Sequence, residues 1–171
     1  MCNTLHNTPI KRTEEILMFF EEFKLGQRFQ CDPILMTSEE IADFATKYDP
    51  QPIHVDKEYA ENSMFNGIIS SGFLTLSKMW GQWIRLNKLG EEFIVGKGLD
   101  YVKFTAPVRK NDVLYTEVEV VNSTPTSNPS RGKVTLKFTM TNQYEEVVLL
   151  TEITVLLKTK ESSNTKQLVT V

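Results

Sequence analysis

The 171-residue chain has only two cysteines, Cys2 and Cys31, and only two histidines. Two cysteines form one disulfide at most, and a chain of this length buries enough core to fold without it. The low cysteine content argues against a small disulfide-stabilised secreted scaffold. It favours a reduced, cytoplasmic protein.

Long apolar runs and blocks of like charge are also missing. No stretch approaches the roughly 18 apolar residues that span a bilayer. The five apolar residues 16–20 are closed by Glu21 and Glu22, without a signal-peptide cleavage site. The formal net charge is −3, and no like-charge run favours a nucleic-acid or membrane-surface partner. We expect no membrane and no nucleic-acid partner.

What the sequence does contain is a change of hydrophobic period between its halves. Strands are predicted over 93–105, 112–122, 132–142 and 146–158, with a long connection over 123–132. The third strand alternates cleanly, since Val134, Leu136, Phe138 and Met140 fall on one face.

The first half combines one broken strand with helices. The strand is predicted over 27–36, interrupted by Pro33, and a helix follows from a capping box of Thr37 and Glu40 to Tyr48. A loop is predicted over 49–56 and a short helix over 57–62. The most apolar segment, 71–88, predicts a helix buried on nearly all sides and ended by Gly90.

These elements predict an α+β fold in which a curved antiparallel sheet wraps around one long central helix. We expect a lead-in over residues 1–22, with a short helix near 13–22. A single domain over 23–158 and a polar C-terminal tail over 159–171 follow.

The segment 49–56 carries the strongest candidate for chemistry. Asp49 and His54 lie five residues apart in a segment stiffened by two prolines. The expected helix end at Asp49 predicts a raised pKa for its carboxyl group, which suits acid/base chemistry. Two other readings remain: an ordinary Asp-Pro turn with a surface histidine, and a metal site that includes Asp56. The metal reading is weaker, because no further ligand clusters there.

A second candidate lies at the start of the apolar helix, in the segment Ser70-Ser71-Gly72. A free N–H group at Gly72 would bind a carbonyl oxygen that gains negative charge. Alternatively, a serine caps the helix and Gly72 only allows close packing. A third group, Lys103, Arg109 and Lys110, would contact carrier phosphates or form a solvated rim.

The segment Asp49-Pro50-Gln51-Pro52-Ile53-His54-Val55-Asp56 resembles the D-x-N-P-x-H-x-D signature of MaoC-like dehydratases, the (R)-specific enoyl-CoA hydratase group. The segments 68–74 and 104–112 resemble that family's central-helix start and its F-x-x-P-V strand and turn. The resemblance covers about residues 23–157. It implies a hot-dog fold, a homodimer, and reversible hydration of an enoyl thioester of CoA or an acyl carrier.

The resemblance implies roles for three positions. Asp49 and His54 would activate water and exchange the α-carbon proton, and the Gly72 N–H would hold the thioester oxygen. No cofactor and no metal are implied.

Two positions depart from the family pattern: Gln51 replaces a frequent Asn, and Ser71 stands where many hydratases have His. We also expect Ser71, Trp80 and Trp83 to contact substrate, the tryptophans by limiting pocket depth. Lys103 and Arg109 complete the expected substrate-binding set. Alternatives are a thioesterase on the same fold and a non-catalytic acyl-thioester-binding module.

Overall fold

The computed structural model describes residues 18–89 and 92–162. Its elements, in chain order, are a 3-10 helix at Phe20–Glu22, β1 (Arg28–Gln30), β2 (Ile34–Leu35), α1 (Ser38–Tyr48), α2 (Pro52–Val55), α3 (Lys57–Glu61), α4 (Gly72–Arg85), β3 (Phe93–Phe104), β4 (Val113–Pro125), β5 (Arg131–Thr141) and β6 (Val147–Lys158). Most of the expected lead-in, Gly90 and residues 163–171 lie outside the described residues.

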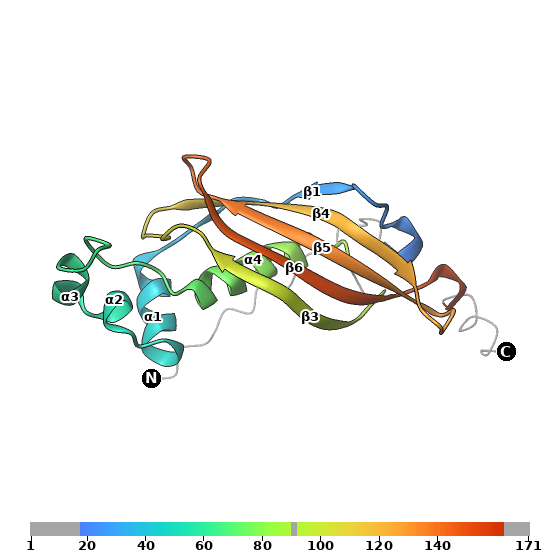
Figure 1. The fold of residues 1–171 in the computed structure, drawn as a ribbon, viewed down its shortest axis with the longest axis horizontal. Helices are drawn as coiled ribbons and strands as arrows, with labels where there is room; N and C mark the ends of the chain where they lie inside the picture. Colours follow the sequence, from blue (N-terminus) through green and yellow to red (C-terminus); the bar gives the residue numbers. More distant parts are fainter. Residues whose placement is uncertain (1–17, 90–91, 163–171) are drawn as a thin grey trace, which may run out of the picture.

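The strands form one antiparallel sheet in the order β1-β4-β5-β6-β3, and β2 adds a short pairing to β4. The sheet curves over α4, which runs along its inner side (Figure 1). The alternation predicted for the third strand is confirmed, because the side chains of Val134, Leu136, Phe138 and Met140 in β5 are fully buried. The α+β hot-dog fold expected from the sequence is therefore confirmed.

The connection between β4 and β5 is shorter than predicted. Ser123 pairs with Val134 and Pro125 pairs with Gly132, so both strands extend into the segment expected to be a loop. On its other side β4 pairs β1 only over Glu117–Glu119. Pro125 therefore lies where the strand has a single neighbour and a missing N–H group is tolerated.

Helix α4 supplies the centre of the core. Trp83 is fully buried and packs edge-on against Phe29 and Phe138, with ring centroids 5.3 and 6.1 Å away. The prediction that this helix is buried on nearly all sides is wrong for the single chain, because Phe73 is 62% exposed and Ile84 is 40% exposed. We call these two residues the exposed stripe of α4, and Phe73 contacts Phe104 of β3 with ring centroids 6.3 Å apart.

Strand β3 forms one edge of the sheet and is exposed along most of its length. It pairs with β6 through three register shifts. Between β3 and the exposed stripe of α4 lies an apolar cavity of about 730 Å³, lined by residues that include Leu76, Trp80, Phe93 and Leu99.

Helices α1, α2 and α3 gather beyond one end of the sheet (Figure 1). We call residues 37–61 the helical end. The predicted capping box is present, since Thr37 accepts from the Glu40 N–H and Glu40 accepts from the Thr37 N–H. The segment expected to be a loop over 49–56 instead contains α2, because Pro52 occupies the first position of a helix, where its missing N–H needs no partner.

Within residues 18–89 and 92–162, no helix is both long and apolar enough to cross a bilayer. The cytoplasmic location expected from the sequence stays a prediction.

Candidate active site

Asp49 lies where α1 ends, and both of its carboxylate oxygens accept hydrogen bonds. The Ser71 hydroxyl donates to Oδ2 at 2.6 Å, and the Gln51 side-chain amide donates to Oδ1 at 2.8 Å. The side chain of Asp49 is 13% exposed. Since Ser71 precedes α4 directly, this carboxylate connects the helical end to the central helix.

The hydrogen bonds set the protonation state of Asp49. The bond from Ser71 is the largest cause, and with the bond from Gln51, and the charge of His54 when it is protonated, it lowers the pKa of Asp49 against the opposing effect of burial. The prediction of a raised pKa was wrong. Two donors aimed at the charged form outweigh the effect of burial, so Asp49 is a carboxylate at neutral pH.

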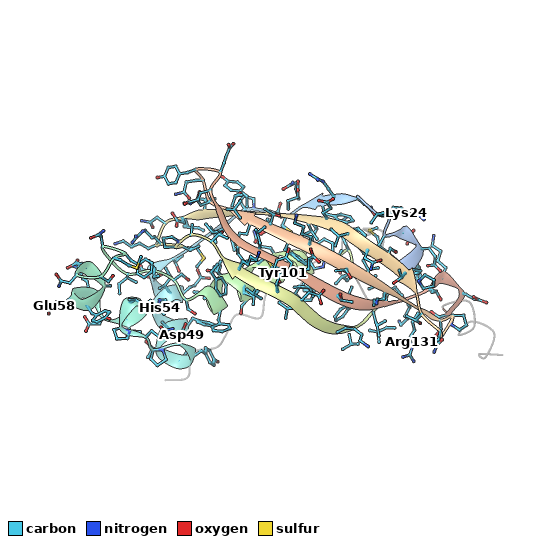
Figure 2. The ribbon with its side chains drawn as sticks, in the orientation of Figure 1. Lys24, Asp49, His54, Glu58, Tyr101 and Arg131 are labelled. Carbon is cyan, nitrogen blue, oxygen red and sulfur yellow. The ribbon has the colours of Figure 1, made fainter. Side chains whose placement is uncertain are left out.

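His54 belongs to α2, and its side chain is only 5% exposed. Its Nδ1 lies 2.9 Å from the Ile69 carbonyl oxygen. A carbonyl only accepts, so Nδ1 must carry the proton. Nε2 then lies 3.4 Å from Asp49 Oδ2, and in a neutral imidazole these two atoms are both acceptors. A proton donor placed between them, such as water, would satisfy both. Figure 2 labels the two residues at the helical end.

The start of α4 shows the serine cap and the close packing that the sequence offered as one alternative. Ser71 caps the helix, because its Oγ accepts from the Phe73 N–H at 3.2 Å. Gly72 also allows close packing, since a Cβ there would lie 2.7 Å from the Phe104 ring. The Gly72 N–H is the first of α4 and has no acceptor inside the helix.

One cavity of about 370 Å³ brings these groups together, and we call it the Asp49 cavity. Asp49, His54 and Gly72 all line it. The remaining lining residues are mostly apolar or aromatic: Gln51, Phe65, Ile69, Ser70, Phe73, Thr75, Phe104, Thr105, Ala106, Pro107, Val108 and Val148. The three residues expected to share the chemistry therefore face one space.

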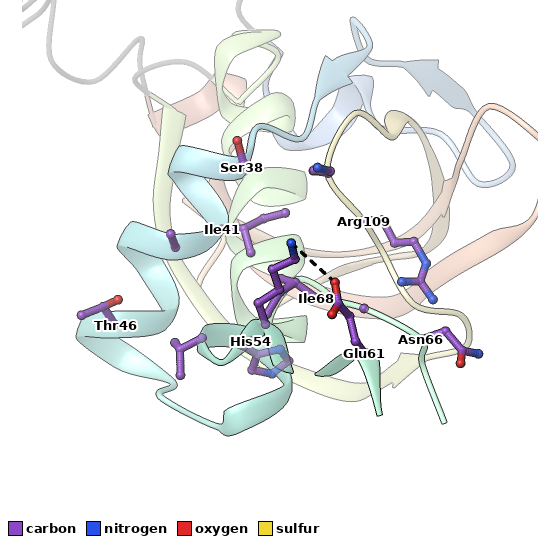
Figure 3. Close-up of a pocket in the computed structure, with 13 residues that line it drawn as sticks. Ser38, Ile41, Thr46, His54, Glu61, Asn66, Ile68 and Arg109 are labelled. Carbon is purple, nitrogen blue, oxygen red and sulfur yellow. Dashed lines mark ion pairs between the residues drawn. The ribbon is translucent and has the colours of Figure 1, made fainter. Parts of the chain in front are cut away.

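A second cavity of about 530 Å³ lies on the other side of His54, between α1 and the 109–110 turn (Figure 3). We call it the basic cavity, because Lys57, Arg109 and Lys110 line it. His54 alone is common to the lining of both cavities.

Other residues singled out from the sequence lie elsewhere. Trp83 is in the core, and Trp80 lines the cavity beneath β3. Lys103 lies on exposed β3, with its Nζ 5.6 Å from the centre of the Tyr101 ring. Ser71 is 1% exposed, and its hydroxyl is used by Asp49 and the helix cap.

The carboxylate of Asp56 caps α3 by accepting from the Tyr59 N–H at 3.0 Å. Among the described residues, no three His, Cys, Asp or Glu side chains gather as metal ligands would.

Two partners in the site were missed by sequence reasoning. The Ile69 carbonyl fixes His54 from 15 positions away, and no local pattern marks it. The donation from Gln51 to Asp49 was also missed, although its spacing of two residues after an aspartate provided a signal.

A family model described as "MaoC like domain" matches residues 22–142. The chain is 37% identical over 141 residues to the uncharacterised protein YdeM of Bacillus subtilis. That match covers 82% of this chain and 99% of YdeM.

Two further similarities carry more functional information. The chain is 29% identical over 119 residues to the (R)-specific enoyl-CoA hydratase of Rhodospirillum rubrum, which covers 64% of this chain and 74% of the hydratase. The crystal structure of the MaoC-like dehydratase from Rhodospirillum rubrum superposes with a TM-score of 0.77 at 30% identity. It covers 84% of this chain and 98% of that one.

Proposed function

The chain belongs to the MaoC-like domain family, and on that premise we propose that it is a hydro-lyase that adds water reversibly to an enoyl thioester of CoA or an acyl carrier. The observation that carries the proposal is the facing pair of Asp49 Oδ2 and His54 Nε2, 3.4 Å apart, beside the first N–H of α4. The (R)-specific enoyl-CoA hydratase among the similar proteins supports the same reaction class.

In the proposed reaction, a water molecule lies beside the two acceptors and donates a hydrogen bond to each. As its oxygen bonds to the β carbon, one proton moves to the pair and the double-bond electrons shift toward the thioester carbonyl. A proton then passes from the pair to the α carbon, so one water is added and no proton is left over. Asp49 remains available as a base because its hydrogen bonds favour the carboxylate.

The Gly72 N–H is proposed to stabilise the thioester oxygen as enolate character develops. The α4 dipole favours negative charge at this position. The absence of a side chain at Gly72 also lets the Phe104 ring lie close to the helix start. In this proposal the Gly72 N–H both binds the thioester oxygen and stabilises the negative charge that develops on it.

We further propose that the protein acts as a homodimer. The exposed edge of β3 leaves apolar side chains in solvent, among them Ile94, Val95, Leu99 and Val102. Beyond its pairing with β6, β3 has no neighbouring strand among the described residues, and an exposed apolar edge of this kind is one that folded proteins cover. Sedimentation of the purified chain should give about twice the monomer mass, and a monomer at micromolar concentration would contradict this part of the proposal.

The function is tested by following the loss of the enoyl absorbance of crotonyl-CoA and longer enoyl-CoAs. Turnover by the wild-type protein, with release of the 3-hydroxyacyl thioester, supports hydration. Release of free CoA without a hydroxyacyl product would identify a thioesterase. Tight binding without turnover would identify a binding module.

A further inference from the structure

The segment 65–70 lies between the helical end and α4, and it holds the imidazole of His54. Its Ile69 carbonyl accepts from His54 Nδ1 at 2.9 Å, and the Ile69 N–H donates to the Ile53 carbonyl at 3.3 Å. Ile69 therefore bonds to two consecutive residues of α2, one through each of its backbone groups. The position of its carbonyl decides how the His54 ring is oriented and which ring nitrogen carries the proton.

Both ends of the segment 65–70 are anchored to neighbouring residues of the turn before β4. At its far end, the Ser70 N–H donates to the Val108 carbonyl at 2.7 Å. At its beginning, the Phe65 carbonyl accepts a hydrogen bond from the Arg109 guanidinium. This second anchor is made by a side chain, so a substitution can remove it and leave the first in place.

The backbone between the two anchors has an unfavourable conformation. Asn66 and Gly67 have φ angles of 52° and 137°, in a region that persists only where the surroundings hold it. The Arg109 guanidinium lies against this stretch, because a Cβ on Gly67 would be 3.7 Å from Nη1 (Figure 3). The same side chain therefore covers the turn and binds the carbonyl at its beginning.

The turn that carries Arg109 is itself held firmly. The Arg109 N–H donates to Asp112 Oδ2 at 2.7 Å, and the Asp112 N–H donates back to the Arg109 carbonyl at 3.2 Å. The other oxygen, Asp112 Oδ1, accepts from the side-chain amide of Gln143 at 2.9 Å. Since Gln143 lies in the connection between β5 and β6, the base of the arginine is tied to the sheet.

Resting on the proposed function, we propose that Arg109 is a positioning residue for His54. By fixing the beginning of the segment 65–70, it keeps the Ile69 carbonyl directed at Nδ1. In the neutral imidazole Nε2 then stays unprotonated and faces Asp49. The sequence predicted instead that Arg109 contacts the substrate. The two roles can be told apart, because a positioning role acts on the imidazole before any substrate binds.

The test is the variant Arg109→Gln, studied without substrate by 1H–15N correlation spectra of the imidazole at alkaline pH. The chain has two histidines, and the variant His6→Gln assigns their signals. We expect wild-type His54 to show one tautomer, protonated on Nδ1, and Arg109→Gln to show a mixture of both. A small misplacement of a reacting group is costly in rate, so kcat for crotonyl-CoA should fall about tenfold while KM changes less than about threefold.

The matched control is Lys110→Gln, which removes a neighbouring positive charge from the lining of the same cavity. No hydrogen bond or ion pair joins the Lys110 side chain to the rest of the described chain. We expect this variant to keep the single tautomer and the wild-type kcat.

The conservative variant Arg109→Lys gives a second test, which does not depend on Arg109→Gln being folded. A lysine keeps a donor for the Phe65 carbonyl but lacks the planar fork of the guanidinium. The share of the Nδ1 tautomer and kcat should therefore fall together, to values between those of the wild type and Arg109→Gln. A lower kcat in Arg109→Lys with an unchanged tautomer would contradict the proposal.

A folded Arg109→Gln protein that keeps the single Nδ1 tautomer would overturn the proposal, as would a wild-type His54 that already shows both tautomers. A rise of KM with an unchanged imidazole would return Arg109 to the substrate-binding role. A lower unfolding midpoint alone would make the arginine a purely structural residue. Absence of turnover by the wild-type protein is a different result, because it rejects the proposed function while the tautomers still decide whether Arg109 orients His54.

Discussion

The helical end and the sheet are held in place by different forces. In the sheet, every second side chain along β5 is apolar and fully buried. Long antiparallel pairing with β4 and β6 fixes the position of the strand. The helical end is held to α4 by polar contacts: Asp49 to Ser71 at 2.6 Å, Glu40 to Lys78 at 2.6 Å, and His54 to the Ile69 carbonyl just before α4 at 2.9 Å.

This difference separates stability from chemistry. Residues of the sheet contribute buried apolar area, which dominates the free energy of unfolding. Residues of the helical end contribute few large buried side chains but hold the two groups on which the proposed reaction depends. Variants in one region are therefore expected to change one property and spare the other.

The largest effect is expected from Asp49→Asn, which keeps the size of the side chain and removes its basicity. We expect kcat for crotonyl-CoA hydration to fall by about a thousandfold, with a smaller loss of stability than truncation of a core side chain causes. The control Asp43→Asn makes the same charge change at a residue on α1 that is 80% exposed and should leave kcat unchanged. A large loss of stability in Asp49→Asn would break the separation between the two regions.

The opposite result is expected from Phe138→Ala in the sheet. Phe138 is fully buried and contacts both Trp80 and Trp83 at 6.1 Å between ring centroids. Its loss should lower the free energy of unfolding by about 3–5 kcal/mol, measured by denaturant titration. The control Tyr144→Ala removes an aromatic ring that is 77% exposed and should change it by less than about 0.5 kcal/mol.

At a temperature where Phe138→Ala stays folded, its kcat should match that of the wild type within about threefold. The substitution removes none of the polar contacts that hold the helical end to α4. A folded but inactive Phe138→Ala protein would show that the core orients the site directly.

Ser71→Ala tests the hydroxyl that connects the two regions. A hydrogen bond to a charged group contributes about 1.5–3 kcal/mol, so kcat should fall about 10- to 100-fold. The control Ser77→Ala removes a serine hydroxyl from α4. That hydroxyl donates only to the Phe73 carbonyl. Restoration of most activity by Ser71→Thr would support a positioning role, whereas an unchanged kcat in Ser71→Ala would refute it.

The same variant makes a prediction about pH. The bond from Ser71 is the main cause of the lowered pKa of Asp49, so its removal raises that pKa. Because the proposed reaction needs the carboxylate, activity falls as the pH drops through this pKa. The acid limb of the pH–kcat profile should therefore move to higher pH in Ser71→Ala.

Stability follows the same linkage. A lowered native pKa means that Asp49 stabilises the fold above the pKa of an unfolded aspartate, and that this contribution is lost as the pH falls through the native value. As the pH falls, the Ser71→Ala protein should lose the stabilisation from Asp49 at a higher pH than the wild type does.

The smallest effect is expected from Thr37→Ala, which removes the cap of α1. The free energy of unfolding should fall by about 1 kcal/mol, while kcat changes less than twofold. The control Thr46→Ala makes the same chemical change inside α1, where the side chain caps nothing. It should not lower the free energy of unfolding. A strong loss of activity in Thr37→Ala would mean that the start of α1 controls the position of Asp49 at its end.

Much of this arrangement could be predicted from local patterns. The alternation around Val134 and Phe138, and the capping box at Thr37, each report on the nearest few residues and were informative about secondary structure. Pro50 marked the end of α1 correctly, whereas Pro52 was assigned to a loop and instead begins α2. The strand extension at Ser123–Pro125 was missed because it depends on pairing with residues about ten positions away.

The site shows the same limit. The carboxylate and imidazole could be identified from spacing and the family motif, but the pKa direction was wrong. It depends on Ser71, 22 positions away in sequence. The exposed stripe of α4 was also missed, since apolar composition alone does not tell whether a helix faces its own sheet or another surface.

The Ser71 oxygen has a further consequence for how charge is distributed. Its Oγ accepts from the Phe73 N–H while its proton is given to Asp49. Hydrogen bonds arranged in such a chain polarise one another, and the first N–H groups of α4 carry the positive end of its dipole. A neutral hydroxyl thus couples the dipole of the central helix to a carboxylate on another segment of the chain.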